Sequence, residues 1–122
     1  MDGILIVDKP QGMTSHDVVD FIRRRFGLKK VGHAGTLDPM ATGVLVMLLG
    51  KATKLSDSIM AHDKEYCAEM TLGQVSDTGD AWGKLEVIDS KVELTEDSIR
   101  VAFKRFLGEI YQTPPMLSLI HI

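Results

Sequence analysis

The stretch that decides the fold is VGHAGTLDPMATGVLVMLLG, residues 31–50. Its first half is rich in glycine and carries His33, Thr36 and Asp38, whereas its second half is an almost unbroken apolar run. Such a run predicts a buried strand over residues 44–49. A polar loop joined to a buried strand is typical of an active-site loop on a rigid scaffold. We therefore expect the polar side chains of this stretch to be presented from a loop.

Two interpretations of Asp38 follow from the residues alone. An aspartate is ionised at neutral pH without help from a neighbour, so Asp38 can act as a nucleophile or stabilise developing positive charge. The pair Asp38-Pro39 is also typical of a helix start, with Asp as the N-cap and Pro at the first helical position. Nearby, Gly32, Gly35 and Gly43 permit backbone conformations that other residues avoid, and they let a ligand approach the main chain. Both interpretations stay open at this point.

Length and composition bound the class of protein. The chain has 122 residues, of which 44% are hydrophobic and 25% charged, as expected for one globular domain. No stretch of about 20 apolar residues exists and no basic region precedes the first apolar run, so we expect neither a membrane partner nor a signal peptide. The single Cys67 cannot form an internal disulfide, which favours a cytoplasmic protein. Because the four histidines and Cys67 lack zinc-type spacing, we expect no metal.

Charge is distributed unevenly along the chain. The net charge is −3, but eight basic and five acidic residues precede position 55, and six basic and twelve acidic residues follow it. A basic cluster beside the 31–50 stretch includes Arg23, Arg24, Lys29 and Lys30. It is a candidate for contacts with the phosphates of a nucleic acid. Basic residues also stabilise the C-terminal end of a helix, so this structural interpretation stays equally open.

The pattern before residue 31 predicts a strand over residues 3–7 and a helix that ends at Gly27. Either Thr14 or Ser15 suits the N-cap of this helix, and we favour Ser15. Acidic residues early in the helix and basic residues late in it agree with the helix dipole. The expected apolar face repeats at helical spacing and comprises Val18, Val19, Ile22 and Phe26.

Beyond residue 50 we expect a helix over residues 55–61, strands over 64–73 and 84–92, and a final helix that starts at Thr95 and ends at Gly108. The acidic loop between the two strands lacks the further ligands of a calcium loop, so we expect its side chains to bond to its own backbone. This order of elements predicts an α+β fold, a mixed sheet with flanking helices. The final helix has an expected core stripe of Ile99, Ala102, Phe103, Phe106 and Leu107.

The string GHAGTLDPMATGVL, residues 32–45, resembles the signature of the tRNA pseudouridine-55 synthases, the TruB-type family. Four other segments resemble family motifs: KPQGMTS at 9–15, KEY at 64–66, SDTGD at 76–80, where the family more often has Thr first, and QTPPMLS at 112–118. The resemblance implies the N-terminal half of the pseudouridine synthase fold. It also implies that Asp38 is the catalytic residue. The implied substrate-binding residues are His33, Tyr66, Gly35 and Thr36.

The implied reaction is isomerisation of a uridine in the T-loop of tRNA to pseudouridine, with the T-stem-loop as binding partner. The N-glycosidic bond is cleaved, the base rotates, and it rejoins the sugar through carbon, so no cofactor and no obligatory protein partner are expected. The nucleotide must first leave its stack, at a cost of a few kcal/mol. Stacking on Tyr66 would contribute about 1–3 kcal/mol. The structural alternative for Tyr66 is packing on a sheet face.

The resemblance covers residues 1–118 as the N-terminal part of a catalytic domain. The family pattern continues with Ala and Lys near positions 119 and 121, where this chain has Leu119 and His121, so we interpret residues 119–122 as a divergent or artefactual tail. Family members carry further on an arginine that pairs with the catalytic aspartate, and usually a C-terminal RNA-binding domain. Because neither is present, we expect this chain alone to be inactive.

Two alternative functions stay open. The chain can be a non-catalytic RNA-binding remnant that keeps the surface and lacks turnover. It can also be a guide-RNA-dependent relative of the box H/ACA type, in which base pairing selects the target. A plain interaction domain would make the match over residues 32–45 a coincidence.

Overall fold

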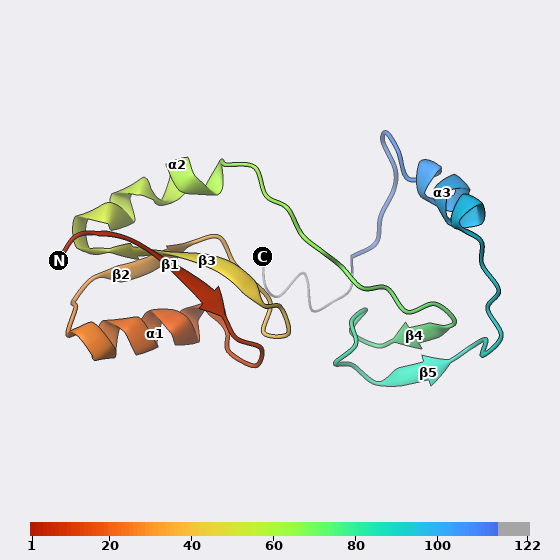
Figure 1. The fold of residues 1–122 in the computed structure, drawn as a ribbon, viewed down its shortest axis with the longest axis horizontal. Helices are drawn as coiled ribbons and strands as arrows, with labels where there is room; N and C mark the ends of the chain where they lie inside the picture. The colour runs from red at the N-terminus through yellow and green to blue at the C-terminus, as the bar shows by residue number, and fades with distance from the viewer. Residues whose placement is uncertain (115–122) are drawn as a thin grey trace. The chain divides into compact units, whose positions relative to one another are not determined.

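The computed structural model describes residues 1–114 (Figure 1). The chain divides into two compact units, Met1–Tyr66 and Cys67–Ile122. None of the described helices has the length and apolar character needed to cross a membrane. The predictions for residues 115–122, which include most of the QTPPMLS segment and the divergent tail, lie outside the described residues.

The first unit contains a three-stranded antiparallel sheet. Its strands are β1 (Gly3–Lys9), β2 (Val31–Ala34) and β3 (Gly43–Leu49), in the order β1-β3-β2. The buried strand expected over residues 44–49 is confirmed. The expectation that the polar side chains of residues 31–50 are presented from a loop was wrong for His33, because the backbone of residues 31–34 pairs with β3 and His33 lies opposite Met47.

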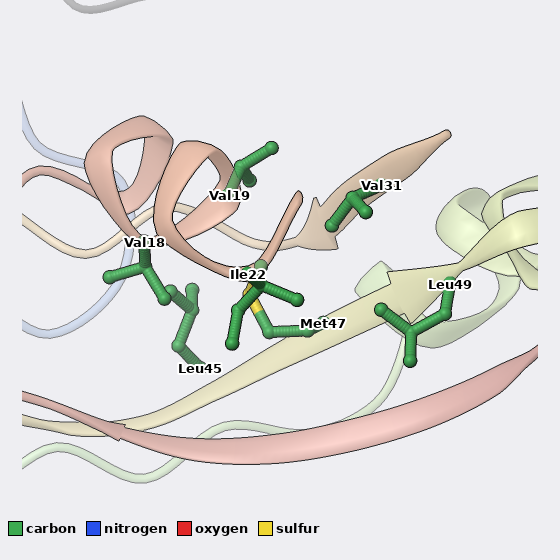
Figure 2. Packing of buried hydrophobic residues seen from close by; sticks show 7 residues of the cluster. All are labelled: Val18, Val19, Ile22, Val31, Leu45, Met47 and Leu49. Carbon is green, nitrogen blue, oxygen red and sulfur yellow. The ribbon is translucent and has the colours of Figure 1, made fainter. Parts of the chain in front are cut away.

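The helix α1 (Ser15–Phe26) packs its apolar face on this sheet. Figure 2 shows side chains of α1 directed toward those of β2 and β3. Phe26 was wrongly assigned to this core: it is 47% exposed, and its ring contacts the Arg25 guanidinium. The buried cluster comprises Val18, Val19, Ile22, Val31, Leu45, Met47 and Leu49.

Both ends of α1 are capped. The N-cap is Thr14 rather than the favoured Ser15: the Thr14 hydroxyl accepts from the Asp17 amide at 2.9 Å, and the Asp17 carboxylate accepts from the Thr14 amide at 2.9 Å. This reciprocal pair satisfies backbone donors that the first turn leaves free. Gly27 ends the helix in the left-handed conformation, as predicted, and its amide donates to the Arg23 carbonyl.

The remainder of the first unit is a 3₁₀ segment η1 (Gly50–Leu55) followed by a short helix α2 (Ser56–Met60). The helix expected over residues 55–61 is therefore confirmed. In Figure 1, α1 and α2 lie on opposite sides of the sheet.

The second unit contains a short hairpin of β4 (Gln74–Ser76) and β5 (Leu85–Val87), which pair antiparallel. The strand predicted over residues 64–73 was wrong: this segment has no strand partner among the described residues, and alternation alone supplies no backbone hydrogen bonds. The strand expected over residues 84–92 is confirmed in its first part only.

The last described helix is α3 (Glu96–Lys104), with Thr95 as N-cap in a second reciprocal pair, with Ser98. It ends before Gly108, the predicted end. The predicted core stripe was wrong for this chain, because Phe103 is 58% exposed and Phe106 67% exposed. The α+β class is confirmed, and the described strand pairs are all antiparallel.

Candidate active site

We call residues 35–42, which connect β2 to β3, the aspartate loop. Asp38 lies at its centre and is exposed. Its carbonyl accepts from the Ala41 amide at 2.9 Å, which closes a turn over Pro39 and Met40, and the chain then enters β3. No helix begins here, so the N-cap interpretation of Asp38 was wrong. Within residues 1–114, the Asp38 carboxylate makes no hydrogen bond and no ion pair, which leaves both oxygens free for a ligand.

The residue before Asp38 is fixed by a buried hydroxyl. Ser15, only 3% exposed at the start of α1, accepts from the Leu37 amide at 2.9 Å and donates to the Leu37 carbonyl at 3.2 Å. One hydroxyl thus satisfies both backbone groups of Leu37. The Leu37 side chain also packs against the hydrophobic core, so the loop is joined to the core directly before Asp38.

The residue after Asp38 is fixed by the segment that links β1 to α1. The Pro39 carbonyl accepts from the Gly12 amide at 2.8 Å and from the Lys9 ammonium at 3.3 Å. One residue further on, the Met40 carbonyl accepts from the Gln11 side chain at 3.2 Å. The backbone on both sides of Asp38 is therefore held while the carboxylate stays free.

Lys9 was not predicted as a site residue, yet the structure buries it completely. Its ammonium donates to the carbonyls of Pro10 at 2.9 Å and Met13 at 2.7 Å, in addition to that of Pro39. A lysine has three donors and all three are used, which makes the burial of the charge tolerable. Lys9 links both ends of the β1–α1 turn to the aspartate loop.

A sequence signal for the burial of Lys9 does exist. Side chains of a strand alternate between the two faces of a sheet. Leu5 and Val7 pack against the core, and Lys9 follows in the same phase of β1. A charged residue that continues an apolar phase is expected to point inward at the end of the strand, where backbone carbonyls of a turn can receive it.

Three of the implied substrate-binding residues, His33, Gly35 and Thr36, precede Asp38 directly along β2 and the aspartate loop. The Nδ1 atom of His33 lies 2.6 Å from the Gly35 carbonyl, and because a carbonyl only accepts, Nδ1 carries the proton of this bond. In the neutral ring Nε2 is then an acceptor. Gly35 has a φ of +102°, which other residues rarely adopt. Thr36 is exposed on the loop.

Tyr66 is not brought to this cluster by any described contact. It is 68% exposed and is the last residue of the first unit. It belongs to no strand, so the alternative of a tyrosine packed on a sheet face was wrong. Its exposed ring leaves a stacking role as a prediction.

The predicted basic cluster lies at the far end of α1 from the aspartate loop. The helix α1 has 12 residues, so its first and last residues lie roughly 16 Å apart along the helix axis. Arg23 forms an ion pair with Asp20 at 3.0 Å, and Arg24 donates from Nε to the Asp20 carbonyl at 3.3 Å. These contacts agree with the structural interpretation for Arg23. The other members of the cluster, Arg24, Lys29 and Lys30, have exposed side chains.

One ionisable group in the first turn of α1 has a shifted pKa. The Thr14 backbone amide, and secondly the Thr14 hydroxyl, hold the pKa of Asp17 below its ordinary value, because both favour the charged form.

Among residues 1–114, no three His, Cys, Asp or Glu side chains gather as a metal site.

Comparison with known proteins gives a family match. The family described as TruB family pseudouridylate synthase (N terminal domain) matches residues 23–122. A tRNA pseudouridine synthase B of Opitutus terrae is 49% identical over 122 residues, which is all of this chain and 51% of that protein. A protein of the same name from Syntrophotalea carbinolica is 51% identical over 118 residues, 97% of this chain and 39% of that protein. The chain thus spans about half, or less, of these curated relatives.

Solved structures also match. A crystal structure of a Cbf5-Nop10-Gar1 complex has a chain that is 32% identical, with a TM-score of 0.58, over 93% of this chain and 29% of that one. A structure of an H/ACA RNP bound to a substrate RNA containing 2′-deoxyuridine has a chain that is 32% identical, with a TM-score of 0.57, over 92% and 30%.

Proposed function

The chain belongs to the TruB family of pseudouridylate synthases, and we propose that it is the part of a tRNA pseudouridine synthase that presents the catalytic aspartate, Asp38, to a uridine in the T-loop of tRNA. The observation that carries this proposal is the geometry around Asp38. Its carboxylate is exposed and free within the described residues, while the backbone on both sides is held by Ser15, Gly12 and Lys9.

This geometry suits a reaction that depends on positioning. In the isomerisation, the bond from the uracil N1 to C1′ of the ribose breaks, and a bond from C5 to C1′ forms. C5 loses a proton and N1 gains one, so no group or electron comes from outside. A carboxylate can stabilise cationic character at C1′ or bond to it transiently, as carboxylates do in glycoside cleavage. A fixed backbone keeps the carboxylate within reach during this step.

The other proposed contacts hold the nucleotide outside its stack. Enzymes that act on a base must extrude it from the helix. We assign the stacking surface to the exposed Tyr66 ring, and a polar contact to His33, whose Nε2 is the acceptor when the ring is neutral. Gly35 and Thr36 lie between His33 and Asp38 and would approach the ribose with little steric obstruction. Arg24, Lys29 and Lys30 are the proposed phosphate contacts, on the T-stem rather than at the reacting uridine.

The experiment needs an active protein that carries these residues. We propose a chimera in which residues 1–122 replace the aligned segment of the Opitutus terrae protein, which supplies the other half of the length. The chimera and the 122-residue chain are each incubated with a T-stem-loop RNA, and the amount of pseudouridine formed is measured. We expect turnover by the chimera and none by the chain alone. No turnover by a folded chimera would contradict the proposal and favour a non-catalytic RNA-binding remnant.

The guide-RNA-dependent alternative has weaker support. Relatives named tRNA pseudouridine synthase B are 42–52% identical to this chain, whereas the matching chains of the H/ACA assemblies are 31–32% identical. A synthase that selects its own target modifies the T-stem-loop without added RNA or protein. A chimera that becomes active only when a guide RNA is added would favour the alternative.

A further inference from the structure

The proposed function uses the Ser15 hydroxyl only as one of the groups that hold the backbone beside Asp38, and it assigns the hydroxyl no effect on the reaction itself. It is buried, with 3% of its surface exposed, although serine is usually an exposed residue. The helix does not need this hydroxyl as a cap, because Thr14 is the N-cap and pairs reciprocally with Asp17. A buried hydroxyl that the helix does not use must be explained by what it contacts.

Within residues 1–114, the hydrogen bonds of its side chain all go to the residue directly before Asp38. The Ser15 hydroxyl accepts from the Leu37 amide and donates to the Leu37 carbonyl, at 2.9 and 3.2 Å. This two-way contact resembles one rung of a sheet ladder and fixes the rotation of both peptide groups that flank Leu37. The second of these peptide groups is the one that carries Asp38, so the direction of the Asp38 side chain depends on it.

We propose that Ser15 is a positioning residue for Asp38, an inference that rests on the proposed function. It acts from the side of Leu37, while Gly12 and Lys9 hold the side of Pro39. Removal of the hydroxyl frees the peptide before Asp38, and the carboxylate then samples directions that do not meet the substrate. The effect falls on kcat, because substrate binding does not use the hydroxyl.

The test is a set of three variants of the chimera described above. Ser15→Ala removes both bonds, Ser15→Thr keeps the hydroxyl, and Thr14→Ala is the matched control. Thr14 is the adjacent residue and its loss weakens the same helix, but it makes no bond to the aspartate loop. All assays are run at a temperature at which circular dichroism shows every variant folded.

We expect Ser15→Ala to lower kcat at least about ten-fold, within the roughly 100-fold that a misplacement of about 1 Å can cost, with KM unchanged. Ser15→Thr should recover most of that loss, and Thr14→Ala should keep kcat within about two-fold. The faster amide exchange expected at Leu37 in Ser15→Ala gives a second readout that does not depend on turnover.

Two results would overturn the inference. The first is an unchanged kcat in folded Ser15→Ala. The second is an equal loss of kcat in Thr14→Ala, which would assign the effect to the helix rather than to the hydroxyl. An Asp38→Asn chimera assayed in parallel separates this failure from that of the proposed function: if Asp38→Asn is fully active, the proposed function fails, whereas an inactive Asp38→Asn beside a fully active Ser15→Ala rejects the role of Ser15 alone.

Discussion

The two units of this chain differ in how their structure is held. In Met1–Tyr66 a helix and a sheet share a buried cluster, and every buried hydrophobic residue of the described chain belongs to this unit. In the described part of Cys67–Ile122, the helix and the hairpin are formed by local hydrogen bonds. The Asp80 carboxylate, for example, accepts from the Trp82 and Gly83 amides, while the apolar side chains of α3 stay exposed.

This difference shows that a short range of sequence can specify local hydrogen bonds but not the burial of a side chain. A cap or a loop bond needs residues that are two to four positions apart, and the second unit has these contacts. Burial needs a second surface. The Asp38 carboxylate is carried by the unit that has its own core, and Leu37 connects the loop to that core. The carboxylate whose action depends on its position is thus carried by the unit in which a buried core fixes the backbone.

The largest difference is expected between substitutions of one apolar side chain in each unit. Met47→Ala should lower the free energy of unfolding by about 2–5 kcal/mol, because a fully buried side chain leaves a cavity. Phe103→Ala, in α3, should change it by less than about 0.5 kcal/mol, since its ring is 58% exposed. Urea denaturation of the 122-residue chain measures both. Equal losses would mean that α3 is as well packed as β3.

A smaller effect is expected at the buried lysine of the first unit. Lys9→Met removes three hydrogen bonds and leaves buried carbonyls without a donor, so we expect a loss of about 1–3 kcal/mol. The exposed Lys51→Met is the matched control, with an expected change within about 0.5 kcal/mol. Thermal and urea unfolding give the values. If Lys9→Met left the free energy of unfolding unchanged, the aspartate loop would not need the hydrogen bonds of Lys9.

The two capping pairs allow a direct comparison of the units. Thr14→Ala and Thr95→Ala each remove a reciprocal N-cap, which typically costs about 1 kcal/mol. We expect Thr14→Ala to shift the cooperative unfolding midpoint, because α1 belongs to the core. Thr95→Ala should reduce the helical circular dichroism signal without moving that midpoint. A midpoint shift of the same size in both variants would mean that the two units unfold together.

The smallest expected effect is a pH dependence at the start of α1. The pKa of Asp17 lies below its ordinary value in the folded chain, because the Thr14 amide and hydroxyl favour the carboxylate. The stabilisation is therefore present above the ordinary pKa and is lost as the pH falls through the folded pKa. An NMR titration of the Asp17 carboxyl measures the shift. In Thr14→Ala the main-chain amide remains and only the hydroxyl contribution disappears, so the pKa should rise part of the way.

The sequence predicted the elements that have a local signal. The strand β3, the helix α1 with Gly27 at its end, and the Thr95 cap were all expected and are confirmed. Tertiary contacts decided the rest: His33 was expected on a loop because a glycine-rich segment gives no strand signal until β3 pairs with it. Phe103 was assigned to a core because helical spacing shows which face is apolar and cannot show whether a partner covers it.

The site was predictable to a different degree. The resemblance selected Asp38, and the structure removed its alternative as a helix cap, since a turn and a strand follow. Neither pattern nor resemblance indicated that Ser15 bonds to Leu37, because the two residues are 22 positions apart and a hydroxyl has no sequence signal for burial. Lys9 had a signal in the alternation of β1, but its targets are carbonyl oxygens, which every residue carries.

The measurement that tests the central claim most directly is the single-turnover rate of the Asp38→Asn chimera on T-stem-loop RNA, with the binding affinity for the same RNA measured beside it. Asp57→Asn, an exposed aspartate of α2, is the matched control. We predict no pseudouridine above background for Asp38→Asn, with RNA affinity within about three-fold of the unsubstituted chimera, because only the reacting group is changed. Pseudouridine formed at the rate of the unsubstituted chimera would remove Asp38 from the reaction and contradict the account.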